Sequence, residues 1–114
     1  MKLLIDENLT PKLATSLAPI TALGIRALGW ADESNGSLLR LMHAEGFTIL
    51  LTSDSKLKYQ QNLEKHRISI IVLEIFKGTR KDQLACVPEI REACLGIKPG
   101  EVRVVLGPHP KRHP

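Results

Sequence analysis

Ile68-Ser69-Ile70-Ile71-Val72-Leu73 is the stretch of sequence that decides the fold. A short and nearly continuous apolar run is typical of a strand in a parallel sheet that is covered on both faces. Similar runs occur at 3–5 and 48–51, and shorter strands are expected at 20–22 and 101–106. The sequence therefore predicts an α/β fold, a three-layer α/β/α sandwich with a central, mostly parallel sheet of four to five strands.

Helical patterns separate these strands. Thr10 before Pro11 is a typical helix start, and Pro19 closes that helix. Ser34 or Asn35 is expected to cap the next helix, which carries leucines on one side and ends at Gly46. The residues between Ile20 and Leu28 fit a weak helix about as well as a short strand.

Two further helices are expected later in the chain. A short one is expected around Tyr59 to Glu64, inside a polar loop. The longer one covers Lys81 to Leu95, where Pro88 must either kink the helix or mark its restart. Cys86 and Cys94 lie eight residues apart in this helix, too far for a disulfide, and are expected to be small buried side chains.

Length and composition limit the domain organisation. The 114 residues are enough for one hydrophobic core, so residues 1–106 are predicted to form a single domain, followed by a basic, disordered tail at 107–114. The start of the chain has no signal-peptide pattern, and no apolar run is long enough to cross a membrane. We therefore expect a cytoplasmic protein without a membrane partner.

Acidic side chains follow two of the predicted strands. Asp6 and Glu7 come directly after the first strand, and Asp54 follows the strand at 48–51. If these strands are neighbours in a parallel sheet, Asp6 and Asp54 lie side by side at its carboxyl edge. Such a pair repels unless a cation lies between the carboxylates, and Mg²⁺ or Mn²⁺ prefers these oxygen ligands. The sequence thus predicts metal ligands at Asp6 and Asp54, with Glu7 assisting catalysis.

A simpler interpretation of the same acids stays open. Asp6 or Asn8 would then cap the following helix, and Asp54 would begin a turn by accepting a hydrogen bond from its own backbone. Asp32 and Glu33 precede the second helix and could reach the same side of the sheet, or be solvated loop acids.

Polar and basic residues near the strand ends are candidates for nucleic-acid binding. Amides and lysines can contact phosphates and base edges, although a solvated helix start explains part of the cluster equally well. Aromatic residues make up only 4% of the chain, which argues against a surface that stacks many bases. The candidates are Asn8, Asn35, Lys56, Lys58, Tyr59, Gln60, Gln61 and Asn62.

Several classes of function are not supported by the sequence. It contains no Ser-His-Asp arrangement, no glycine-rich phosphate loop and no zinc pattern. Gly24 and Gly29 do not form a dinucleotide-binding fingerprint, so a nicotinamide enzyme is not expected.

Four spaced segments carry a resemblance to a known family. They are Met1 to Pro11, Gly29-Trp30 with Asn35-Gly36 and Leu38-Leu39, Gly46 to Asp54, and Tyr59 to Leu63. Together they resemble the small PIN-like proteins of the DUF5615 family, which are related to Mut7-C-type domains. The likeness covers roughly residues 1 to 75.

The resemblance implies a PIN-like fold and a magnesium-dependent ribonuclease site, with Asp6 and Asp54 matching two of the family's acids. It also implies RNA as substrate, the role of toxin in a prokaryotic toxin–antitoxin pair, a small antitoxin partner and a homodimer. The chain departs from the family at Lys56, where relatives have an acid, and in the second helix, where Glu45 is the only acid. A catalytically weakened nucleic-acid-binding or protein-interaction module is therefore the alternative.

Overall fold

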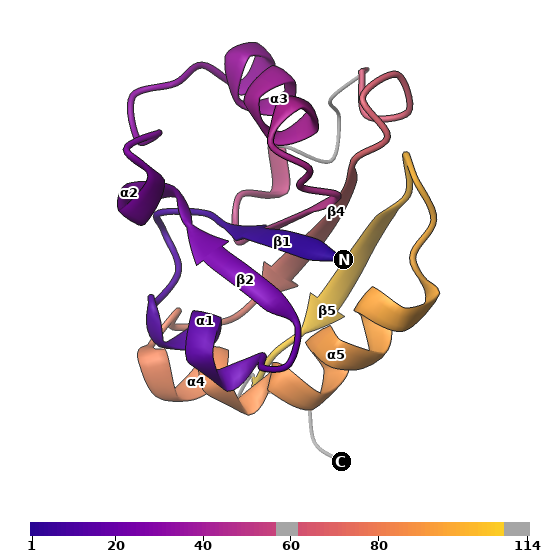
Figure 1. Cartoon of the computed structure of the whole chain (residues 1–114). Coiled ribbons are helices and arrows are strands. Elements are labelled where there is room, and N and C mark those ends of the chain that lie inside the picture. The colour runs from indigo at the N-terminus through magenta and orange to yellow at the C-terminus, as the bar shows by residue number, and fades with distance from the viewer. Residues whose placement is uncertain (57–61, 109–114) are drawn as a thin grey trace.

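Five strands form one sheet in the computed structural model, which describes residues 1–56 and 62–108. All four neighbouring pairs are parallel, and the spatial order is β2-β1-β3-β4-β5 (Figure 1). This confirms the α/β fold with a parallel sheet. The strands are β1 (Lys2–Ile5), β2 (Thr21–Gly24), β3 (Ile49–Thr52), β4 (Ser69–Glu74) and β5 (Val102–Leu106).

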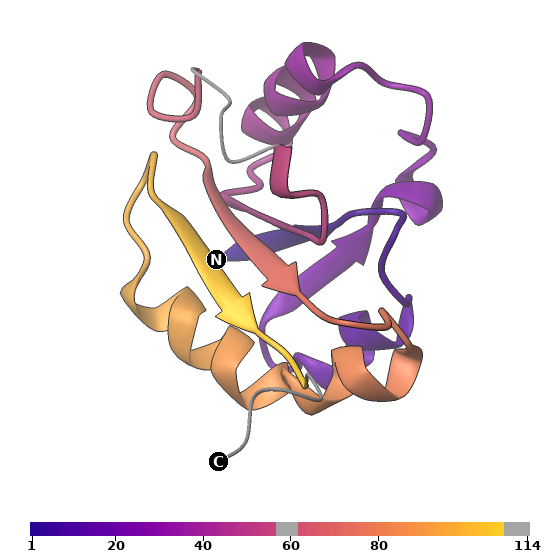
Figure 2. The ribbon, with the colours of Figure 1, turned by 180° about the vertical axis from the view of Figure 1, so that it is seen from behind.

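Helices cover both faces of the sheet, which gives three layers. Figures 1 and 2 show α1, α4 and α5 below the sheet, and α2 and α3 above it. The lower layer comprises α1 (Lys12–Ser16), α4 (Arg80–Ala85) and α5 (Val87–Gly96), and the upper layer comprises α2 (Ile25–Leu28) and α3 (Asn35–Ala44).

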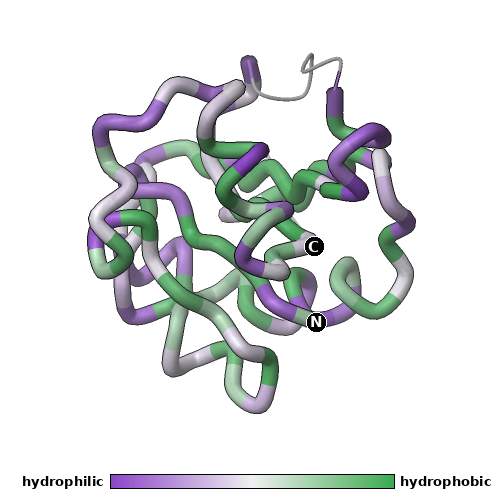
Figure 3. The backbone as a smooth tube through the Cα atoms, turned by 45° about the horizontal axis from the view of Figure 1, so that its top comes forward, coloured by the Kyte–Doolittle hydropathy of each residue, from purple (hydrophilic) through white to green (hydrophobic). Residues whose placement is uncertain are grey.

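The core is divided between the two faces by the alternation of side chains along each strand. Leu3 and Ile5 pack toward α1 and α5, whereas Leu4 between them packs toward α3. β4 is buried from Ser69 to Leu73, as its continuous apolar run predicts. Figure 3 shows hydrophobic chain segments through the middle of the fold.

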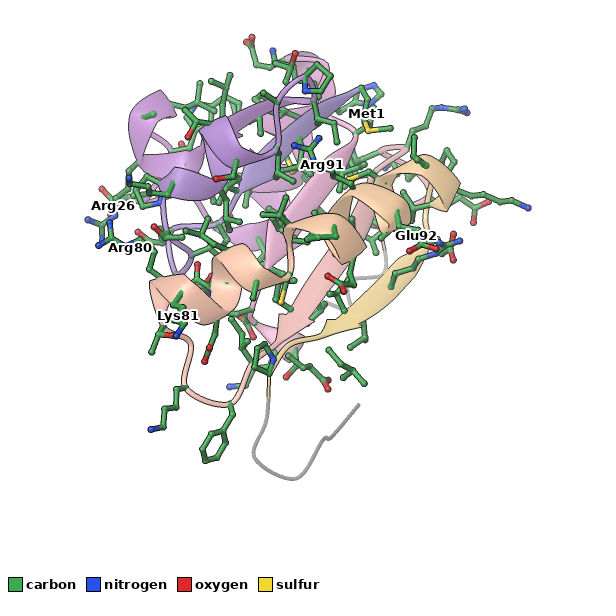
Figure 4. The ribbon with its side chains drawn as sticks, turned by 90° about the horizontal axis from the view of Figure 1, so that it is seen from below. Met1, Arg26, Arg80, Lys81, Arg91 and Glu92 are labelled. Carbon is green, nitrogen blue, oxygen red and sulfur yellow. The ribbon has the colours of Figure 1, made fainter. Side chains whose placement is uncertain are left out.

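Helix caps and side-chain contacts hold the helices of both layers in place. Ser34 caps α3 by accepting a hydrogen bond from the Ser37 N–H at 3.2 Å, and Gly46 adopts the left-handed φ of 82° after this helix, both as predicted. On the lower face, Arg91 extends from α5 and donates to the carbonyl oxygens of Ser16 and Leu17 at 2.6 and 3.2 Å (Figure 4). Arg91 therefore ties α5 to the end of α1.

The structure shows the outcome of two predicted helix details. The segment 81–95 forms two helices separated by Cys86, and Pro88 lies in the first turn of α5, so the proline marks a restart. Thr10 was expected to cap α1; the helix is assigned from Lys12 with Pro11 before it, and the Thr10 hydroxyl accepts a long hydrogen bond of 3.4 Å from the Lys12 N–H. The Thr10 N–H also donates to the buried amide oxygen of Gln83 at 2.6 Å, which holds this residue against α4.

Other predictions concern residues near the gap or inside the core. The helix expected at 59–64 lies partly outside the described residues, and Asn62 onward forms turns. The predicted tail at 107–114 is described only as far as Pro108. Cys86 and Cys94 are free and buried, as expected, and burial raises the pKa of both thiols.

Glu101, just before β5, is expected to make folding stability depend on acid pH. The Lys98 N–H and the Arg103 guanidinium donate to its carboxylate and lower its pKa. Its contribution to stability is therefore complete above the unfolded-state pKa of about 4.3 and is lost as the pH falls through the lower folded-state value. Urea unfolding between pH 3 and 6 should show a shallower loss of stability for Glu101→Gln than for the wild type. Equal slopes for the two proteins would contradict this assignment.

Candidate functional site

Asp6 and Asp54 lie at the same edge of the sheet because β1 and β3 are neighbours. Asp6 follows β1 directly and its N–H donates to the Leu51 carbonyl of β3 at 2.9 Å, while Asp54 follows β3 by two residues. After β1 the chain forms β2 on one side of it, and after β3 the chain forms β4 and β5 on the other side. A reversal of strand order of this kind opens a crevice at the carboxyl ends of parallel strands, where ligands bind in α/β proteins.

A cavity of about 240 Å³ occupies this position. Both predicted metal ligands line it, together with acids and amides from the loops after β1 and before α3. The polar lining residues are Asp6, Glu7, Asn8, Glu33, Asn35 and Asp54, and Trp30 lies among them. The structure thus brings together six of the residues that the sequence singled out, including Glu33 from the loop before α3, whereas Asp32 does not line the cavity.

Thr52, the last residue of β3, links the two carboxylates. Its side chain is fully buried, and its hydroxyl donates to Asp6 Oδ2 at 2.6 Å while accepting from the Asp54 N–H at 3.0 Å. A buried hydroxyl held at both ends fixes the rotamer of Asp6 and the path of the chain at Asp54. The two acids are therefore positioned by one residue.

Both carboxylates also have local structural roles. Asp54 Oδ1 accepts from the Lys56 N–H at 2.9 Å, the turn that the simpler interpretation predicts, and Asp6 Oδ1 accepts from the Glu7 N–H at 2.8 Å. Neither acid caps a helix. Each carboxylate oxygen has two lone pairs, so these bonds leave acceptor capacity on both side chains. The structural roles and a ligand-binding role are compatible.

The remaining predicted residues are distributed unevenly. Glu7 is exposed and forms a loose ion pair with Arg26 at 3.7 Å, and Asn8 accepts from the Ser53 N–H at 3.5 Å. Lys56 and Asn62 are exposed and do not line the cavity. The predicted nucleic-acid contacts of Lys58, Tyr59, Gln60 and Gln61 lie outside the described residues.

The donor set suits a hard divalent cation. Within residues 1–56 and 62–108, no group of three or more His, Cys, Asp or Glu side chains is placed to hold a metal ion. Mg²⁺ does not require such a group, because it commonly binds through one or two carboxylates and keeps several waters. Asp6 and Asp54, with the amide oxygens of Asn8 and Asn35, are the residues that would hold it.

Sequence reasoning missed two contributors to this site. Thr52 continues the apolar pattern of β3 as a strand residue, and nothing in its local sequence distinguishes a hydroxyl that bonds two distant groups. Trp30 packs edge-on against Phe47 with ring centroids 5.6 Å apart, and its indole reaches the cavity. As the sole tryptophan, Trp30 is a built-in fluorescence reporter for this site.

Replacing Thr52 by valine is expected to weaken the site while keeping its shape. The substitution removes the donor to Asp6 and the acceptor for the Asp54 N–H, and loss of such an orienting partner typically lowers metal affinity or activity about 10–100-fold. Mn²⁺ titration followed by Trp30 fluorescence measures the effect. Thr52→Ser keeps the hydroxyl and should stay near wild type; equal affinities for the valine and serine variants would show that the hydroxyl has no role.

We found no match for this chain to a family model, to a curated protein or to a solved structure. In the part of the chain that the structure describes, no helix is both long enough and apolar enough to cross a membrane.

Proposed function

We propose that this chain is a metal-dependent endoribonuclease of the PIN-like type. The observation that carries the proposal is that Asp6 and Asp54, from adjacent strands, line one cavity at the switch point of the sheet and are joined through Thr52. Two carboxylates at this position have a clear use in holding a cation beside a phosphodiester.

Each residue has a defined task in this proposal. Asp6 and Asp54 hold Mg²⁺ or Mn²⁺, which when bound would supply an activated water and neutralise charge on the phosphate. Thr52 keeps the Asp6 carboxylate in its orientation. Asn8 and Asn35 offer amide groups from the cavity wall, and Glu7 stands at the rim, where it can accept a proton from the attacking water.

Basic side chains supply the attraction for RNA. Arg26 on α2, and Arg80 and Lys81 at the start of α4, lie toward the same side of the molecule (Figure 4). These helices begin after the carboxyl ends of β2 and β4, the edge that carries the cavity. Lys56 is exposed directly after Asp54. Lys56, two residues after Asp54, and Arg26, next to the cavity-lining Ile25, would attract the phosphates beside the cleaved bond, and Arg80 and Lys81 would add positive charge at this edge of the sheet.

The biological setting of the proposal rests on the family resemblance alone. It implies a toxin whose activity is blocked by a small antitoxin protein in the same cell. The proposed protein partner is therefore this antitoxin. Co-purification of the chain with the product of a neighbouring gene would test the pairing.

A second candidate function has its own observation. Four acids line the cavity, Asp6, Glu7, Glu33 and Asp54, but among the described residues no three His, Cys, Asp or Glu side chains are grouped to hold a metal ion. A weakened site of this kind fits a nucleic-acid-binding module that keeps the fold without cleavage.

RNA cleavage in the presence and absence of divalent cations separates the two candidates. The full chain is incubated with a mixed-sequence single-stranded RNA in Mg²⁺, in Mn²⁺ and in EDTA. The nuclease proposal requires cleavage with a cation and its loss in EDTA. RNA binding without cleavage under every condition would favour the binding module, and the absence of both would remove the two candidates together.

A further inference from the structure

A second and larger cavity opens beside the candidate site. Its volume is about 600 Å³, and it lies around the carboxyl end of β2, between α1 and α2. It shares Asp6, Glu7 and Ile25 with the acidic cavity, so the two cavities adjoin. Its apolar wall includes Leu9, Ala14, Ala22, Gly24, Ile25 and Ala27.

Part of the cavity wall is built from small side chains. Three alanines and a glycine line it, and a Cβ added at Gly24 would meet no other atom within 4 Å. The φ of Gly24 is −86°, a value open to any residue, so backbone geometry does not require glycine there. A volume of this size lies inside the range of about 300–1,000 Å³ for small-molecule sites.

Three charged side chains line the cavity as well: Asp6, Glu7 and Arg26. The Glu7 carboxylate and the Arg26 guanidinium lie 3.7 Å apart with 42% and 78% of their side-chain surfaces exposed. An ion pair so exposed contributes little to stability and can exchange its partner for a ligand. The Glu7–Arg26 pair thus presents an acceptor and a planar set of donors next to an apolar chamber.

We propose that this cavity receives a nucleobase, and that the phosphate attached to the same nucleotide faces the acidic cavity; the second part rests on the proposed function. A base has apolar faces that aliphatic walls can cover, and an edge that carries both donors and acceptors. Guanine fits these groups best, because its amino group can donate to one oxygen of Glu7, which leaves the second oxygen for the attacking water, while O6 and N7 accept from Arg26. The adjoining cavities would then select RNA sites that contain guanine.

The test uses free guanosine, which carries no phosphate and needs no metal. ¹H–¹⁵N spectra of the full chain are recorded during titration with guanosine, and with ribose as a control. We expect saturable shifts at the amides of Leu9, Gly24 and Ala27 with guanosine and none with ribose. No shifts with guanosine, or equal shifts with ribose, would overturn the proposal.

A matched pair of variants locates the binding site. Ala27 and Ala44 are both exposed helix positions, but only Ala27 lines the cavity, so Ala27→Leu adds bulk at the cavity and Ala44→Leu makes the same change outside it. Guanosine affinity should fall at least about tenfold in Ala27→Leu, equivalent to 1.4 kcal/mol, and stay unchanged in Ala44→Leu. Gly24→Leu should block the cavity from the β2 side. It provides a second measurement of guanosine affinity if Ala27→Leu does not fold. Equal affinities in all three variants would place guanosine elsewhere and overturn the proposal.

The result is independent of the nuclease proposal. Guanosine binding by a chain that cleaves no RNA would keep the base site and remove the nuclease. Cation-dependent cleavage that Ala27→Leu leaves unchanged, without guanosine binding, would keep the nuclease and remove the base site.

Discussion

Replacing Asp6 or Asp54 by asparagine is expected to lower the rate of RNA cleavage at least about 100-fold, because losing a metal ligand should cost no less than losing a residue that orients one. Asparagine has the same shape as aspartate. At position 54 its carbonyl oxygen can still accept from the Lys56 N–H. At position 6 its carbonyl oxygen can accept from the Glu7 N–H, while its amide NH₂ faces the Thr52 hydroxyl and can donate to it. The substitution therefore removes negative charge from the cavity and changes packing little. Single-turnover cleavage of a labelled RNA in Mn²⁺ measures the effect.

A neighbouring acid provides the control for this prediction. Asp32 is exposed and lies in the loop before α3, but it does not line the cavity. Asp32→Asn makes the same chemical change and the same change in net charge, so its cleavage rate should stay near wild type. A similar loss in all three variants would point to general electrostatics, and full activity of Asp6→Asn would exclude Asp6 as a ligand.

The largest effect on stability is expected for Phe47→Ala, at about 3–5 kcal/mol. Phe47 is only 2% exposed and lies between α3 and β3, where it packs against Trp30 and beneath the Lys2 ammonium, 4.4 Å from the ring centroid. Truncation leaves a cavity in the upper core, and a loss of this size removes a large share of the 5–15 kcal/mol typical of a domain. Urea unfolding followed by Trp30 fluorescence measures it.

Two variants show whether burial explains the loss. Phe47→Leu keeps most of the apolar volume and should cost less than the alanine variant. Phe76→Ala removes a phenylalanine that is 55% exposed, and should cost less than about 1 kcal/mol. Equal losses for Phe47→Ala and Phe76→Ala would mean that the upper core does not depend on Phe47.

The sequence predicts the layers of this fold well because they depend on local patterns. The run at Ile68 to Leu73 is buried on both faces, as its composition requires. Pro88 signals the break between α4 and α5, because a proline cannot donate within a helix. Such local patterns do not predict the strand order, since it depends on which helix covers which face of the sheet.

The candidate site was predictable only in part, for the same reason. The placement of Asp6 and Asp54 follows once β1 and β3 are neighbours, but the Thr52 bridge between them is a tertiary contact with no local signal. The apolar cavity was missed because it arises where side chains are small. Ala22 and Gly24 lie in a segment whose pattern does not distinguish a strand from a helix. A cavity also leaves no periodic pattern in the sequence that could predict it.

The central claim is that Asp6 and Asp54 bind one divalent cation, and paramagnetic NMR with Mn²⁺ tests it most directly. Substoichiometric Mn²⁺ should broaden the amide signals of Asp6, Thr52 and Asp54 first, and the broadening should disappear in the Asp6→Asn, Asp54→Asn double variant. Broadening that is absent, or that persists unchanged in the double variant, would contradict the claim.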